Sequence, residues 1–144
     1  MRKFILTLLA LMFSMSIFAH GPTPQKVQES ITVSVTPAKA WSTVKDFSSF
    51  KKIMKIRSFD DEIMKIKYEM LKKDGPFSDY NAYIIVKKGA NDNESVIQWT
   101  ARFYRIYKLN PPIPEGQDDA TAKAAVKKIV ESGLANLKKS LASK

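Results

Sequence analysis

The sequence contains no cysteine and a single histidine, His20. The lack of cysteine excludes disulfide bridges, cysteine-ligated zinc, iron–sulfur clusters and a thiol nucleophile. One histidine also excludes any site that needs two imidazoles, and a Ser-His-Asp triad would have to use His20. The five glycines are scattered along the chain, so there is no glycine-rich phosphate-binding loop. Most catalytic chemistries are therefore excluded.

The first nineteen residues have the three-part plan of a secretory signal peptide. Two basic residues follow the initial methionine, residues 4–13 form an almost continuous apolar run, and a shorter, more polar stretch ends at Ala19. The apolar run is too short to span a bilayer. We predict a signal peptide over residues 1–19, export to a bacterial periplasm and no membrane span after cleavage. A retained anchor or a buried helix is the alternative.

The charge of the chain is strongly positive, with 24 Lys and Arg against 14 Asp and Glu and a formal net charge of +10. Removing residues 1–19 takes away two basic residues and no acid, which leaves 125 residues with a net charge of +8. This length predicts a single domain over residues 20–144. The positive surplus favours acidic proteins or anionic lipids as partners, and export disfavours nucleic acid. A solvated basic surface without a partner is the alternative.

Hydrophobic periodicity divides the mature chain into strands and two helices. Thr36 and Pro37 are typical of a helix start, and the first helix should end near Phe50. Asp118 and Asp119 begin a second helix that runs almost to the C-terminus. Alternation with period two predicts strands over residues 27–35, 53–59, 64–70, 80–86 and 94–107. The lysine-rich strand over 53–59 suits an exposed edge. The order indicates an α+β domain in which a long helix crosses an antiparallel sheet.

Three segments resemble the START-like helix-grip superfamily, which includes the polyketide cyclase-like proteins. They are TPAKAWSTVKDF from Thr36, WTARFYR from Trp99, and the C-terminal helix from Asp118. The segment HGPTPQKV over residues 20–27 is similar to the start of the MxaD-type branch, periplasmic accessory proteins of bacterial methanol oxidation. The resemblance implies a curved antiparallel sheet packed on the last helix, no cofactor, and assistance to the interaction between methanol dehydrogenase and its cytochrome c.

The chain departs from this family after the first helix. Phe50, Lys51 and Lys52 run directly into Ile53, where the family has two further strands, so roughly 30 residues are missing, enough for a hairpin. We therefore expect a sheet shortened to about five strands, with an open or shallow cavity. An internal deletion that impairs function is the alternative.

Four aromatic residues are candidates for lining an apolar pocket under the last helix: Tyr68, Tyr83, Trp99 and Phe103. They favour a carrier or binder of a small apolar ligand. The alternative is that they are ordinary core residues.

Six basic residues near the predicted edge strand form a second candidate site: Lys51, Lys52, Lys55, Arg57, Lys72 and Lys73. Transient redox encounters are small and are steered by charge, so such a cluster suits weak binding to acidic periplasmic proteins. With the resemblance, this supports a non-enzymatic accessory protein that assists methanol dehydrogenase and its cytochrome c.

The remaining polar groups do not form a catalytic or metal site. The acids at 60–62 and 118–119 lie where turns and helix caps favour carboxylates. After cleavage His20 would be the amino terminus and could chelate copper, but the chain lacks the second histidine that oxidative copper sites use. We predict no catalytic residue, no metal and no cofactor.

Overall fold

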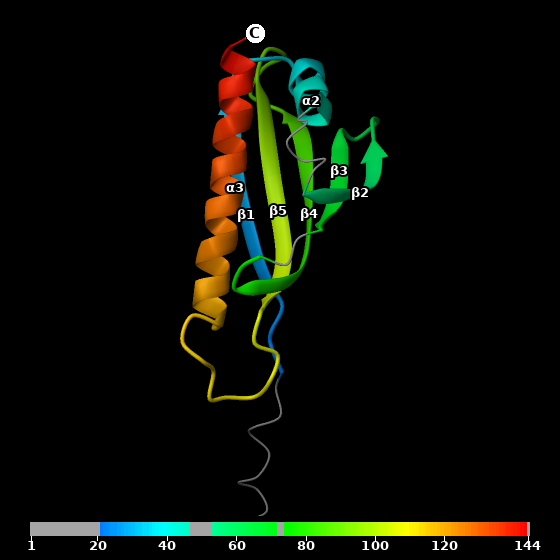
Figure 1. Ribbon diagram of the computed structural model, residues 1–144. Coiled ribbons are helices and arrows are strands. Elements are labelled where there is room, and N and C mark those ends of the chain that lie inside the picture. Colours follow the sequence, from blue (N-terminus) through cyan, green and yellow to red (C-terminus); the bar gives the residue numbers. More distant parts are fainter. Residues whose placement is uncertain (1–20, 47–52, 72–73, 144) are drawn as a thin grey trace, which may run out of the picture.

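The computed structural model describes residues 21–46, 53–71 and 74–143. This part of the chain forms one antiparallel sheet and two helices (Figure 1). The elements in chain order are β1 (Gln25–Val33), α2 (Pro37–Asp46), β2 (Met54–Asp60), β3 (Lys65–Met70), β4 (Phe77–Lys88), β5 (Ser95–Arg105) and α3 (Asp119–Ala142). The five strands lie in the order β1-β5-β4-β3-β2. The predicted α+β class, with a five-stranded curved sheet and a long C-terminal helix, is confirmed.

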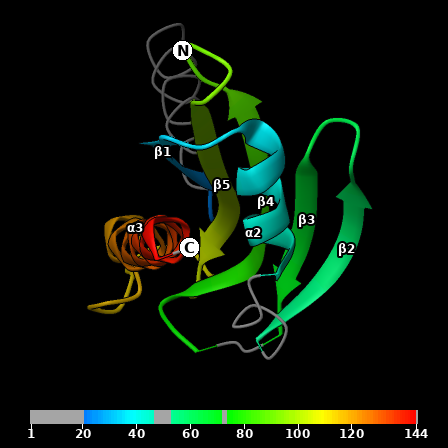
Figure 2. The same cartoon turned by 90° about the horizontal axis from the view of Figure 1, so that it is seen from above.

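Helix α3 lies along the sheet beside β1 and β5 (Figures 1 and 2). Its first turn is capped by Asp118, whose carboxylate accepts a hydrogen bond from the backbone N–H of Thr121 at 2.6 Å, and this bond lowers the pKa of Asp118. Apolar residues three or four apart face the sheet, as an amphipathic helix requires: Ala122, Val126, Val130, Leu134, Leu137 and Leu141. None of the described helices is long and apolar enough to cross a membrane.

Helix α2 covers one end of the same face of the sheet, which we call the inner face (Figure 2). The turn between β2 and β3 holds it there through Asp61. The Asp61 carboxylate accepts hydrogen bonds from the indole of Trp41 and the ammonium of Lys45, both at 2.8 Å, which lower the pKa of Asp61. Asp60 accepts from two backbone N–H groups of the same turn. The structure thus places both acids in turn and packing roles.

The observed strands differ from the predicted ones mainly at their ends. Strand β1 is shifted toward the N-terminus by two residues, and β4 extends from Phe77 to Lys88, well beyond the predicted 80–86. The extension crosses a bulge between Ser78 and Asn81, where Asp79 has a φ of 51°. Strand β2 lies at the edge of the sheet, as predicted. The signal peptide, the end of the first helix near Phe50 and the deletion after Lys52 lie outside the described residues.

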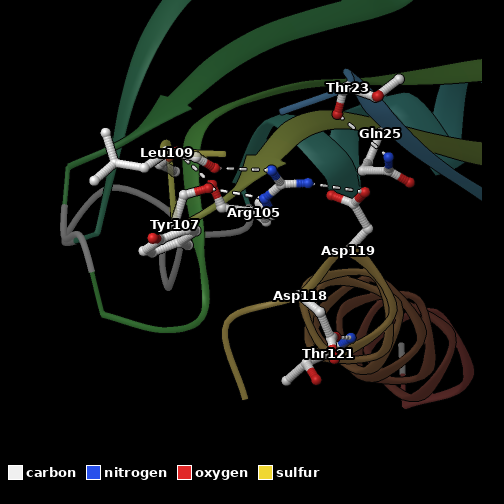
Figure 3. A network of polar contacts seen from close by, with 9 residues as sticks. Thr23, Gln25, Arg105, Tyr107, Leu109, Asp118, Asp119 and Thr121 are labelled. Atoms are coloured by element: carbon white, nitrogen blue, oxygen red, sulfur yellow. Dashed lines mark hydrogen bonds and ion pairs between the residues drawn. The ribbon is translucent and has the colours of Figure 1, made fainter. Parts of the chain in front are cut away.

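A buried arginine joins the end of β5 to the start of α3 (Figure 3). Only 5% of Arg105 is exposed. Its Nε donates to the carbonyl of Tyr107 at 2.9 Å, one Nη donates to the carbonyl of Leu109 at 3.3 Å, and the other lies 3.4 Å from the Asp119 carboxylate. One side chain therefore fixes both the loop after β5 and the first turn of α3.

Candidate functional site

An open groove lies between α3 and the start of β2 and β4. Its volume is about 560 Å³, and most of its exposed lining is apolar. The sheet side contributes Ile53, Met54, Phe77 and Trp99, and the helix side contributes Ala125, Lys128, Ile129, Ser132, Gly133 and Asn136. Residues Asp74, Gly75 and Pro76 close one border. Site volumes of roughly 300–1,000 Å³ are usual for small-molecule ligands, so the groove can hold one.

The floor of the groove is the indole of Trp99, which contacts α3 at Gly133. A Cβ atom at Gly133 would lie 2.2 Å from Cζ3 of Trp99 and 2.6 Å from Cη2, closer than any side chain can approach. Glycine at this position therefore lets the helix pass directly over the ring. Because the ring lies against the helix backbone at Gly133, the Trp99 side chain closes the bottom of the groove.

Two tyrosines lie beneath this floor. The hydroxyls of Tyr68 and Tyr80 are 2.8 Å apart, and the ring of Tyr68 meets the ring of Trp99 edge-on at a centroid distance of 6.0 Å. Burial raises the pKa of both tyrosines, and the neighbouring hydroxyl raises that of Tyr68 further. Both remain protonated at neutral pH, so they act as hydrogen-bonding core residues and not as bases.

The structure brings three of the four predicted aromatic residues together. Tyr68, Trp99 and Phe103 all lie on the inner face and are each 1% exposed. Of these three, Trp99 lines the groove, whereas Tyr68 and Phe103 belong to the core around it. Tyr83 is separate from them: it lies on the opposite face of the sheet, which we call the outer face, and is half-buried there.

Of the six predicted basic residues, the structure describes two. Lys55 and Arg57 are exposed on the edge strand β2, and Arg57 makes an ion pair with Glu69 on β3. The other four, Lys51, Lys52, Lys72 and Lys73, lie outside the described residues. Their proximity to one another therefore stays a prediction.

Several lining residues were not singled out from the sequence. Gly133 is one of the five scattered glycines, and Phe77 and Ile129 belong to neither set of candidate site residues. A signal existed for Gly133, because a glycine inside a long helix costs about 1 kcal/mol and is retained for a packing reason.

The groove offers little for acid–base or metal chemistry. Among the described residues that line it, the ionisable ones are Asp74 and Lys128. Within residues 21–46, 53–71 and 74–143, no three His, Cys, Asp or Glu side chains come together as metal ligands do. An apolar surface with few polar groups at its rim is an arrangement for binding.

The fold is a curved antiparallel sheet with a long C-terminal helix against its inner face, and it defines the START-like class. The family model described as "Polyketide cyclase / dehydrase and lipid transport" matches residues 53–142. The chain belongs to this family. No curated protein matches the sequence.

Solved structures of the same class are similar in fold and distant in sequence. An uncharacterised protein from Bacillus thuringiensis is 17% identical with a TM-score of 0.66, covering 81% of this chain and 98% of its own. XoxI from Bacillus cereus is 17% identical with a TM-score of 0.65, covering 81% of this chain and 94% of its own. The Zhui aromatase/cyclase from a Streptomyces species is 11% identical with a TM-score of 0.57, covering 83% and 94%. At these identities the likeness concerns the fold alone.

Proposed function

We propose that the protein binds a small apolar ligand in the groove between α3 and the β2–β4 side of the sheet. The observation that carries this proposal is the apolar lining of a groove of about 560 Å³, with Trp99 as its floor. The description of the family, which includes lipid transport, supports a ligand of this kind. The open shape of the groove suits exchange of a carried ligand.

A binding function is favoured over catalysis by the chemistry of the lining. The buried hydroxyls of Tyr68 and Tyr80 are held protonated by burial, and the described part of the groove lining contributes one carboxylate and one ammonium group. Acid–base catalysis needs a group with a pKa near the working pH within reach of the reacting atom. We therefore propose a carrier or binder without enzymatic activity.

Filling the groove should abolish binding of an apolar probe. Ser132 is exposed on α3 and lines the groove, so Ser132→Trp places an indole in the ligand volume without removing a core contact. We expect the affinity for the neutral dye N-phenylnaphthylamine, measured by fluorescence titration, to fall at least about tenfold. Ala135→Trp is the matched control, because Ala135 is exposed on the same helix and outside the groove. Equal affinity of both variants and the parent would refute the groove as the binding site.

We also propose, as a second candidate, an exported accessory protein that assists the interaction of methanol dehydrogenase with its cytochrome c. The support is the similarity of residues 20–27 to the MxaD-type branch and the net charge of +8 that remains without residues 1–19, which suits acidic partners. The proposal includes periplasmic localisation after removal of residues 1–19. Adding the protein should speed reduction of the cytochrome by the dehydrogenase at low ionic strength, and less so as salt rises. An unchanged rate at low ionic strength would contradict it.

A further inference from the structure

The outer face of the sheet carries a concentration of positive charge. Both helices lie on the inner face (Figure 2), and the lysine and arginine side chains on the outer face are exposed or half-buried. Four cations from three strands lie around Tyr83: Lys26 on β1, Lys65 and Lys67 on β3, and Arg102 on β5. We call these four residues the outer basic face. A further outward cation, Lys87 on β4, donates a hydrogen bond to Gln98.

None of these four cations makes an ion pair with another described residue. The nearby acids are already engaged, because Glu69 pairs with Arg57, and Asp60 accepts hydrogen bonds from backbone N–H groups of its own turn. Lys26 and Arg102 are direct partners in the β1–β5 register. Like charges in that position destabilise a sheet, and an added negative charge would relieve the repulsion. The arrangement is therefore complementary to an anionic partner.

Three of these cations, Lys65, Lys67 and Arg102, border a hollow of about 410 Å³. Its lining also includes Tyr83, Thr100 and one acid, Glu69, which is paired with Arg57. Lys65 Nζ lies 4.1 Å from the centroid of the Tyr83 ring. A hydrogen bond with Thr100, together with the positive charges of Lys65, Lys26 and Arg102, lowers the pKa of Tyr83. Cations therefore outnumber acids around Tyr83, and the Arg102 guanidinium lies there as a donor for carboxylates.

We propose that the outer basic face docks an acidic segment of a partner protein, with its carboxylates in the hollow around Tyr83. A protein partner is favoured over a lipid surface, because membrane-surface segments combine cations with exposed apolar side chains. The large exposed apolar residues of the described part are Ile53, Phe59, Ile63, Leu71 and Leu109, and none of them lines the hollow. The proposal does not depend on the groove, which opens on the other face.

The test is binding of a fluorescein-labelled oligo-glutamate peptide to protein expressed from the complete chain, at about 20 mM salt. The double reversal K67E/R102E should weaken binding at least about tenfold, because it places two negative charges at the hollow. The matched control K39E/K123E makes the same change in net charge on exposed residues of α2 and α3, and should change the affinity less than about twofold. Both variants should give the far-UV circular dichroism spectrum of the parent protein, which shows that the fold is intact.

Three results would overturn the proposal: no peptide binding by the parent protein, equal weakening in both variants, or capture by phosphatidylglycerol vesicles without any binding of the peptide. If K67E/R102E does not fold, the neutral pair K67Q/R102Q replaces it. Amide chemical shifts of the unmodified protein give an independent readout. Peptide-induced shifts should concentrate at Lys67, Tyr83 and Arg102, and shifts concentrated on the α3 lysines would refute the assigned face.

Discussion

Replacing Trp99 by alanine is expected to lower the free energy of unfolding by about 3–5 kcal/mol. The indole is 1% exposed, contacts the Tyr68 ring edge-on and lies against α3 at Gly133, so its removal leaves a cavity at the centre of the core. Urea denaturation followed by circular dichroism measures the loss. Tyr83→Ala is the control: it removes a half-buried aromatic ring from the outer face and should cost less than about 1 kcal/mol. Equal losses at both positions would contradict the central role of Trp99.

The contact between Trp99 and Gly133 should also make the two positions strongly non-additive. Gly133→Ala alone is expected to destabilise the protein by about 1–3 kcal/mol through overpacking, because the new methyl group overlaps the indole. In the Trp99→Ala background the ring is gone, and the same change should be neutral or stabilising because alanine favours helix by up to about 1 kcal/mol. A double-mutant cycle measures the coupling. Additive effects would show that the helix and the ring adjust independently.

Replacing Arg105 by methionine is the second change with a large expected effect, a loss of about 3–5 kcal/mol. The substitution leaves the Asp119 carboxylate without its cation and the carbonyls of Tyr107 and Leu109 without their donors (Figure 3). Denaturation measures the loss, and proteolysis should show earlier cleavage between β5 and α3. Arg102→Met on the same strand is the matched control and should stay within about 0.5 kcal/mol, since Arg102 is exposed. Comparable losses would mean that Arg105 is no more than a surface charge.

The class of fold was predictable because hydrophobic periodicity is a local property. Alternation from Met64 to Met70 correctly identified a strand with one buried face, and the acids Asp118 and Asp119 correctly marked the start of the long helix. The ends of the strands were less predictable. A bulge at Asp79 lets β4 continue through a position where alternation is interrupted, and nothing in the local pattern distinguishes that from a loop.

The site was predictable only in part, because an aromatic residue type alone does not determine which face of the sheet the side chain occupies. Alternation in β4 puts Tyr83 on the opposite face from Ala82 and Ile84, so its sequence position already separates it from Trp99. The groove itself depends on residues brought together by tertiary packing, such as Phe77 and Ile129. The outer basic face likewise needs the strand order, because Lys26 and Arg102 are far apart in sequence and become neighbours only in the sheet.

The fit of the Trp99 ring against Gly133 limits how α3 can move. Sliding the helix along its axis by about one turn would bring Ile129 or Leu137, which lie one turn before and after Gly133 on the same helix face and carry a Cβ atom, over the ring that glycine now accommodates. The contact between the Trp99 ring and Gly133 therefore fixes the axial position of α3. Sliding of α3 along its axis therefore cannot open the groove for a ligand. The opposite border of the groove is formed by Gly75 and Pro76, which lead into β4.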